Sequence, residues 1–280
     1  NPEGALEEIK KLETKYMGHV ENLYSDAAIK AKTREFLQDR FLYMRSFAKG
    51  VFTSFEEKII VSQGEIMSTN MMNNFLLEKG IKSVLIDALS FMRTNKNSEP
   101  DLPYIKEHLA AVMEKNPGKQ IYITQGFICR NAYGEVDNLL RGGSDYTASL
   151  IGAALPADEI QIWTDIDGMH NNDPRFVENT KAVRQLNFEE AAELAYFGAK
   201  ILHPTCVQPA KFAGIPVRLK NTMKPDAEGT IINNEQGKGT IKAVAAKDNI
   251  TAIKIKSSRM LLATGFLRKV FEIFESYQTP

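Results

Sequence analysis

A pair of glycines beside charged residues is the feature of this sequence most suited to binding an anion. It lies in the run Arg141-Gly142-Gly143-Ser144-Asp145. Glycine lets the backbone approach a ligand closely, and a helix that begins there offers free N–H groups to a phosphate or carboxylate. We expect Ser144 to cap that helix, with Asp145 in its first turn. Arg141 adds a fork that can hold a carboxylate through two hydrogen bonds. The alternative is a tight turn with a capped helix and no ligand.

A second candidate site follows a short apolar run. The segment Trp163-Thr164-Asp165-Ile166-Asp167-Gly168 ends a predicted strand in hydroxyl and carboxylate groups and leads to Asp173-Pro174-Arg175. Ligands of open α/β sheets gather at the carboxyl ends of strands. The alternative is that these aspartates only cap a turn.

Two further segments carry single charged groups. Lys200 lies in a predicted helix-to-loop junction that runs from Gly198 to Pro204 and also contains His203. A lysine is suited to nucleotide phosphates, but it is also common at helix ends, and we expect His203 to be structural. The run Ser62-Gln63-Gly64-Glu65 predicts a turn leading into a helix, in which Glu65 binds an ammonium group or simply favours the helix start.

The elements that position these groups alternate between strands and helices. This order predicts an α/β fold with a mostly parallel sheet. The apolar residues fall at helical spacing from about residue 6 to 45. Further helices are expected over 103–113, 145–155, 188–196 and 205–213, and strands over 83–86, 120–124, 159–163 and 216–219, with a turn around Tyr133-Gly134.

A boundary is expected after this region, because residues 226–229 and 233–239 are rich in turn formers. Beyond it, Ile253 and Ile255 alternate with lysines as in a strand. One face of a predicted helix then carries apolar side chains, namely Leu267, Val270, Phe271 and Phe274.

Composition excludes several classes of function. Lys plus Arg and Asp plus Glu are both 35, so no net charge favours nucleic acid or an anionic membrane. There is no membrane-length apolar run, signal peptide, P-loop, G-x-G-x-x-G or histidine metal motif. Two cysteines without a C-x-x-C pattern indicate a reducing compartment, so we expect a cytoplasmic protein. The first residue is not Met, and we expect both ends to be cut.

Seven blocks, taken in order, resemble the aspartokinase family of the amino-acid kinase fold. They are Gly64-Glu65, Gly126-Phe127-Ile128, Arg141 to Asp145, Trp163 to Gly168, Asp173-Pro174-Arg175, Glu193 to Pro204, and Asn221-Thr222. The resemblance implies a three-layer α/β sandwich with a mostly parallel central sheet. It also implies a catalytic domain over residues 1–234 and, over 235–280, a linker and truncated ACT regulatory domain.

The resemblance also implies a role for each matching residue. Glu65 would meet the amino group of L-aspartate, and Asp145 would be the catalytic residue at the reaction centre. Arg141 and Ser144, with Gly142 and Gly143 forming the turn between them, would hold the substrate's carboxylates. The residues implied to contact ATP are Thr164, Asp165, His170, Arg175, Lys200 and Ile201. Mg²⁺ would arrive bridging the ATP phosphates, and no separate metal site is expected.

The sequence departs from the family at two places. Val136-Asp137-Asn138-Leu139-Leu140 stands where the family has a threonine-rich stretch and a glycine, so those hydroxyl groups are missing. The family also opens with a strand and a K-x-G-G-T-S loop that supplies a phosphate-contacting lysine. No such loop is in this sequence, and we expect ATP chemistry to fail without it.

The last residues are similar to the start of an ACT domain, from Asn249 to Ile255 and from Gly265 to Phe271. Complete family members carry two such units, which bind an end-product amino acid and shape the dimer. The resemblance therefore implies feedback by lysine or threonine and a homodimer formed through ACT domains.

The implied reaction moves the γ-phosphoryl group of ATP to the side-chain carboxylate of L-aspartate. The product is 4-phospho-L-aspartate, in the first step of lysine, threonine and methionine biosynthesis. One alternative is another member of the fold that acts on glutamate, acetylglutamate or a nucleotide. Another is a non-catalytic subunit that senses an amino acid.

Overall fold

The computed structural model describes residues 1–139, 142–173, 176–197, 203–236, 241–246, 250–256 and 264–277. The chain divides into two compact units, residues 1–246 and 247–280. The first unit contains a group of long helices followed by alternating strands and helices, and the described residues of the second contain one helix.

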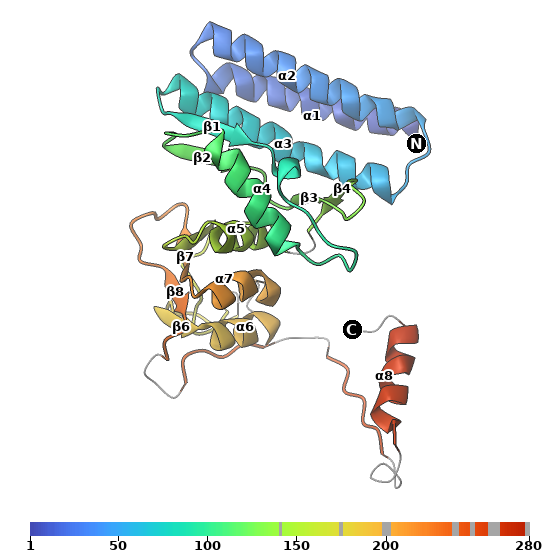
Figure 1. The fold of residues 1–280 in the computed structure, drawn as a ribbon, viewed down its shortest axis with the longest axis vertical. Coiled ribbons are helices and arrows are strands. Elements are labelled where there is room, and N and C mark those ends of the chain that lie inside the picture. Colours follow the sequence, from blue (N-terminus) through green and yellow to red (C-terminus); the bar gives the residue numbers. More distant parts are fainter. Residues whose placement is uncertain are drawn as a thin grey trace. The chain divides into compact units, whose positions relative to one another are not determined.

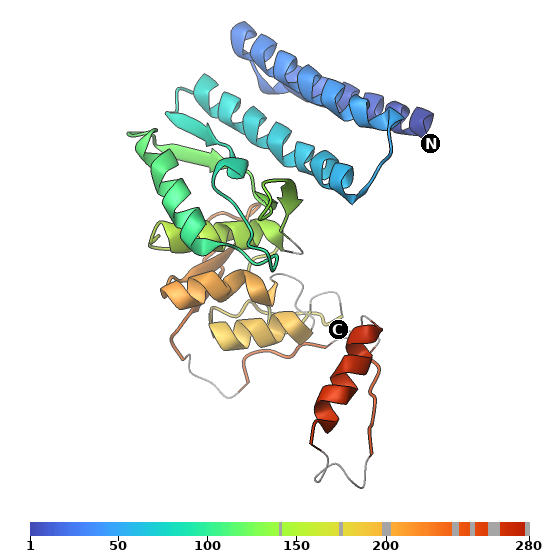
Figure 2. The ribbon, with the colours of Figure 1, turned by 45° about the vertical axis from the view of Figure 1, so that its right-hand side comes forward.

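Three long helices open the first unit: α1 (Pro2–Leu23), α2 (Ala27–Ser46) and α3 (Ser54–Glu78). They lie side by side in both ribbon views (Figures 1 and 2) around a buried apolar core. The predicted helical stretch is confirmed as two helices. Tyr24 caps the end of α1, and its hydroxyl donates a hydrogen bond to the Met71 carbonyl of α3 at 2.8 Å. A short 3₁₀ turn, η1 (Phe47–Lys49), follows α2.

The turn predicted at residues 62–65 is wrong, because α3 runs straight through it. A capping box formed by Thr53 and Glu56 fixes the helix start. Ser62 and Gln63 donate side-chain hydrogen bonds to carbonyl groups four residues earlier, so they stay within the helix. The single glycine at position 64 costs only about 1 kcal/mol relative to alanine, and burial of the apolar side chains of α3 offsets that cost.

The next strands form two small sheets. β1 (Ser83–Ile86) pairs in parallel with β2 (Ile121–Thr124), and α4 (Leu102–Glu114) crosses between them after the turn η2 (Ala88–Ser90). These three predictions are confirmed. β3 (Ile128–Arg130) and β4 (Val136–Asn138) then form an antiparallel hairpin around the predicted turn at Gly134.

A four-stranded sheet completes the first unit, in the order β5-β7-β8-β6. The predicted strands β5 (Ile160–Thr164) and β7 (Val217–Asn221) pair in parallel, as do β6 (Gln185–Asn187) and β8 (Thr230–Asn233). The pair β7–β8 is antiparallel. Parallel pairing thus predominates among the described strands, as predicted, and the sheet's apolar core includes Leu186, Val217, Leu219 and Ile232.

The helices of this region are α5 (Gly143–Ala154), α6 (Phe188–Phe197) and α7 (Gln208–Ala213). The first two confirm the predictions to within two residues. The helix predicted over 205–213 is instead a 3₁₀ turn, η3 (Pro204–Val207), followed by the short α7. Prolines 204 and 209 explain the difference, because proline suits the first positions of a helix and breaks its interior.

In the second unit, α8 (Phe266–Ser276) confirms the predicted helix. Its apolar face is exposed, with Leu267 at 63 % and Phe271 at 65 %. The strand predicted around Ile253 and Ile255 is wrong, since residues 250–256 are exposed and pair with no strand among the described residues. An alternating pattern needs a neighbouring strand to form a ladder. No described helix in either unit combines the length and the apolar character needed to cross a membrane.

Candidate functional site

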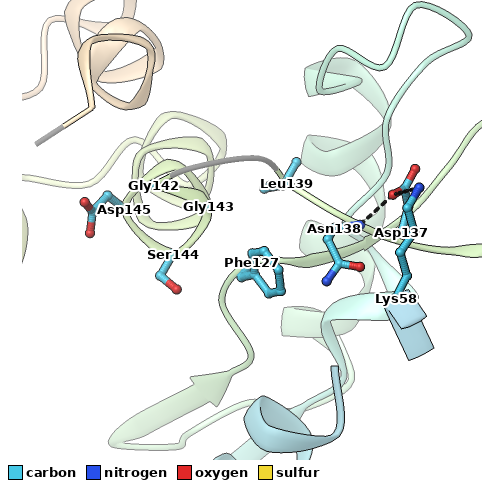
Figure 3. Close-up of a pocket in the computed structure, with 9 residues that line it drawn as sticks. All are labelled: Lys58, Phe127, Asp137, Asn138, Leu139, Gly142, Gly143, Ser144 and Asp145. Atoms are coloured by element: carbon cyan, nitrogen blue, oxygen red, sulfur yellow. Dashed lines mark hydrogen bonds and ion pairs between the residues drawn. The ribbon is translucent and has the colours of Figure 1, made fainter. Parts of the chain in front are cut away.

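The glycine turn lines a cavity of about 520 Å³ in the first unit (Figure 3). Its walls come from three places: the start of α5, the hairpin β3–β4 and helix α3. The lining residues are Lys58, Phe127, Asp137, Asn138, Leu139, Gly142, Gly143, Ser144 and Asp145. Three of the predicted substrate-binding residues and the predicted catalytic residue therefore lie together.

Helix α5 begins with a glycine cap. Gly142 has a φ of 73°, a left-handed conformation that favours glycine, and its carbonyl accepts from the N–H of Tyr146 at 2.9 Å. The prediction that Ser144 caps the helix is wrong, because Ser144 lies inside the first turn and Gly142 occupies the cap position. No side chain among the described residues caps α5, and the residues at this positive end of its dipole, Gly142 to Asp145, line the cavity.

The Gly142 turn packs on the segment around η3. The Cys206 thiol donates to the Gly142 carbonyl at 3.1 Å. A Cβ atom at Gly142 would lie 2.6 Å from the Cys206 sulfur and 2.8 Å from the Cβ atom of His203. The turn predicted to bind aspartate therefore contacts His203 and Cys206, which follow shortly after Lys200 and Ile201, the residues predicted to bind ATP.

Asp145 lies in the first turn of α5, as predicted, and is partly buried. Burial raises the pKa of its carboxyl above the ordinary value. Burial also raises the pKa of the Cys206 thiol to about 12, and the negative charge of Asp145 adds to that shift. The Asp145 carboxyl and the Cys206 thiol therefore lie in one poorly solvated region next to the Gly142–Gly143 turn.

An ion pair that the sequence did not predict closes another side of the cavity. The ammonium of Lys58 lies 2.7 Å from the Asp137 carboxylate, and Figure 3 shows the pair beside Asn138. No local pattern links a lysine of α3 to an aspartate almost eighty positions later. The only signal in the sequence was the departure from the family at residues 136–140.

Glu65 lies in the middle of α3 and is not among the residues that line the cavity. It is partly buried, and this burial raises the pKa of its carboxyl. Glu65 is seven positions after Lys58, or about two helical turns, so both side chains project from the same side of α3. The carbonyl of Glu65 also accepts from the Thr69 hydroxyl, which in turn accepts from the side chain of Gln125 at the end of β2.

Thr164 and Asp165 form a second group at the carboxyl end of β5. The Thr164 carbonyl accepts from the N–H of Thr222 at 2.8 Å. The side chain of Asn221 donates to the Asp165 carbonyl at 3.3 Å. The ends of the parallel strands β5 and β7 therefore lie side by side, as expected for a ligand site of an α/β sheet.

His170 is held by hydrogen bonds from both ring nitrogens. Nδ1 lies 2.8 Å from the Thr180 hydroxyl and Nε2 lies 2.8 Å from the Asp167 carboxylate. The hydrogen bond from His170 lowers the pKa of Asp167. These contacts fix the loop that follows Thr164 at the end of β5 and carries Asp165 and His170.

The same loop is anchored to β8 through Thr230. Its hydroxyl accepts from the N–H of Met169 at 2.9 Å and donates to the Val183 carbonyl at 2.6 Å. Gly168 has a φ of 113°, and a Cβ atom there would lie 2.3 Å from the Thr230 hydroxyl oxygen. Only glycine fits this close approach. The remaining predicted site residues, namely Arg141, Arg175, Lys200 and Ile201, lie outside the described residues.

Comparison with known proteins identifies the family of the chain. The sequence profile of the Amino acid kinase family matches residues 7–221. The chain is 39 % identical over 218 residues to lysine-sensitive aspartokinase 3 of Escherichia coli (strain K12), covering 76 % of this chain and 49 % of that protein. It is 40 % identical over 226 residues to chloroplastic aspartokinase 1 of Arabidopsis thaliana, covering 77 % of this chain and 39 % of that protein.

A solved structure, E. coli aspartokinase III in complex with aspartate and ADP, has a TM-score of 0.81 to this chain at 30 % identity. The match covers 99 % of this chain and 63 % of that one. The matches to the two curated relatives, by contrast, span half or less of the length of those proteins. The profile match covers most of its length and the α/β fold agrees, so the chain belongs to the amino acid kinase family.

Proposed function

We propose that this chain is part of an aspartate kinase, which transfers the γ-phosphoryl group of ATP to the side-chain carboxylate of L-aspartate. The observation that carries the proposal is the cavity at the start of α5, where Gly142, Gly143 and Ser144 meet the partly buried carboxyl of Asp145. A structural relative with 30 % identity was solved with aspartate and ADP, which are the acceptor substrate and the nucleotide product of this reaction.

The reaction places two anions in line and offsets their repulsion. In the proposed complex, Arg141, Ser144 and the N–H groups of the glycine turn hold the carboxylates of aspartate, and Glu65 meets its ammonium group. Asp145 orients the reacting groups. The nucleotide lies at the carboxyl end of β5 against Thr164, Asp165 and His170, with Arg175, Lys200 and Ile201 supplying further contacts. Mg²⁺ arrives with the ATP phosphates.

The product, 4-phospho-L-aspartate, starts the route to lysine, threonine and methionine. Regulation by lysine is supported by the name of a relative, lysine-sensitive aspartokinase 3, while threonine remains the other proposed effector. We place the start of an ACT regulatory domain in residues 235–280, and propose a homodimer formed through such domains. The two described cysteines are unpaired and buried, which is compatible with the proposed cytoplasmic location.

Calorimetric titration of the chain with L-aspartate, ADP and L-lysine tests the proposal. Binding of aspartate and ADP supports a kinase, and formation of an acyl phosphate by the full-length enzyme, trapped with hydroxylamine, identifies the transfer. Glutamate and N-acetylglutamate serve as competing acceptors, and a preference for either would assign the chain to another kinase of the same family. Binding of lysine alone would instead indicate an amino-acid-sensing subunit.

A further inference from the structure

The wall of the cavity opposite α5 is held in place by the Lys58–Asp137 ion pair. One oxygen of the Asp137 carboxylate accepts from Lys58 at 2.7 Å and from the backbone N–H of Asn138, also at 2.7 Å. Asn138 ends β4 and pairs with Ile128 of β3. The next residue, Leu139, donates its N–H to the Phe127 carbonyl at 2.7 Å. Helix α3 therefore fixes the backbone of Asn138 through a single carboxylate.

Asn138 has a side-chain oxygen that is buried and has no hydrogen-bond partner in the part of the chain that the structure describes. Buried polar atoms are nearly always paired, because leaving one unpaired is costly. Asn138 lines the same cavity as Ser144 and Asp145 (Figure 3). The unpaired acceptor is therefore carried by a side chain that lines the proposed acceptor site, and rotation of that side chain would present the oxygen to a ligand with an N–H or O–H donor.

The chemistry of the proposed substrate identifies that donor. An amino acid with two carboxylates offers a single kind of donor, its ammonium group, and a carboxylate would be repelled by a carbonyl oxygen. The donor groups of ATP are on its base and ribose, and the proposed nucleotide contacts lie at the carboxyl end of β5. The ammonium of the amino-acid substrate is therefore the group that matches Asn138.

We propose that Asn138 is a specificity-determining residue that accepts a hydrogen bond from the substrate's ammonium group, and that the Lys58–Asp137 pair positions it. The inference deepens the proposed function and rests on it. Asn138 stands in the stretch where the family has threonines, so this chain uses a different side chain on that wall.

Succinate tests the contact, because it is aspartate without the ammonium group. We expect Asn138→Leu to weaken aspartate binding about tenfold or more, as loss of a hydrogen bond to a charged group does, and to leave succinate binding within about twofold, well inside that range. Both affinities are measured by calorimetry on the chain with ADP present. Equal weakening for both ligands, or no change for aspartate, would overturn the inference.

The positioning role has its own measurement. Lys58→Met should weaken aspartate binding severalfold without changing ADP binding, and Lys58→Arg should restore it by reforming the ion pair with Asp137. The matched control is Lys11→Met, because Lys11 forms a surface ion pair on α1. A loss that Lys58→Arg does not restore, or that extends equally to ADP, contradicts positioning. If the unaltered chain binds ADP but no aspartate, the proposed function fails and this inference fails with it.

Discussion

At the scale of single residues, Asp145 is subject to two opposing electrostatic effects. The dipole of α5 favours a carboxylate in the first turn, whereas burial disfavours the charge, and burial prevails because the pKa is raised. A carboxyl that is easier to protonate in the folded state stabilises the protein most at acid pH. Its contribution is complete below the ordinary pKa of 3.8 and is lost as the pH rises through the higher folded-state pKa.

Asp145→Asn should therefore separate stability from catalysis. At pH 7 the variant should be as stable as the wild type or slightly more so, because it removes a buried charge, and this advantage should disappear below about pH 4, near the unperturbed pKa of aspartate. We expect kcat of the full-length enzyme to fall by on the order of a hundredfold, with ATP affinity little changed. Thermal unfolding at both pH values and steady-state kinetics check this. Turnover within about threefold of the wild type, which is under about 1 kcal/mol, would contradict a catalytic role.

Gly142 gives a second prediction at this scale. Gly142→Ala places a Cβ atom against Cys206 and His203 in a left-handed conformation, which by itself costs about 1–2 kcal/mol. We expect a larger loss of stability, and weaker binding of both aspartate and ADP in the fraction that remains folded. Calorimetry and thermal unfolding measure the two effects.

Gly214→Ala is the matched control for Gly142→Ala. Gly214 also has a left-handed backbone, with a φ of 69°, but nothing lies within 4 Å of an added Cβ atom. Gly214→Ala should be destabilised only by the cost of the left-handed backbone, and it should keep the affinities for aspartate and ADP. Equal behaviour of the two variants would show that the contact with η3 does not matter for binding.

At the scale of elements, the loop between β5 and β6 depends on its anchor at Thr230. Thr230→Val keeps the shape of the side chain but leaves the N–H of Met169 and the Val183 carbonyl without their partner. This should lower the free energy of unfolding by about 1–3 kcal/mol. We expect ADP affinity to fall severalfold while aspartate affinity is nearly retained, because the loop carries the proposed nucleotide contacts. Titration with each ligand, below the melting temperature of the variant, measures both. A selective loss of aspartate affinity would show that this loop serves the acceptor instead.

The elements also show what sequence patterns can predict. Strands β1, β2, β5 and β7 and helices α4, α5 and α6 were predicted, because each has a clear apolar period bounded by turn residues. β3, β4 and β6 were missed because each has only three residues, and β8 was missed because it lies between two turn-rich stretches. The false turn in α3 arose from Gly64, whose cost is small beside the burial along a long helix.

In the candidate site, too, local features were predictable and contacts between distant elements were not. The glycine turn and Asp145 were predictable, because adjacent residues form them. Lys58 and the unpaired oxygen of Asn138 were not, because their roles depend on contacts between α3 and β4 that no local pattern encodes.

At the scale of the whole molecule, the last residues of the first unit, 241–246, form a connecting segment that precedes the second unit in the chain and packs on the rest of the first. Lys242 pairs with Glu190 at 2.6 Å, and the N–H of Val244 donates to the Asn171 carbonyl at 2.9 Å. Asn171 directly follows His170 in the loop proposed to bind ATP. The connecting segment therefore contacts both that loop and the start of α6.

Truncation of the full-length enzyme after Ala246 preserves this connecting segment and removes the second unit. We expect feedback by lysine or threonine to be lost while nucleotide binding remains, because the proposed effector site lies beyond the cut. Inhibition assays and ADP titration on the truncated enzyme measure the two properties. Feedback that survives truncation would place the effector site in the first unit.

The thiol of Cys206, buried behind the glycine turn, makes that turn accessible to chemical kinetics. With a pKa of about 12, only about one molecule in 10⁵ carries a thiolate at pH 7, and the thiolate is the form that alkylating reagents attack. Labelling of Cys206 therefore requires the turn to open, and its rate reports the free energy of that local opening. Any molecule that binds at the start of α5 and holds the turn closed will slow the labelling, whether or not it is a substrate.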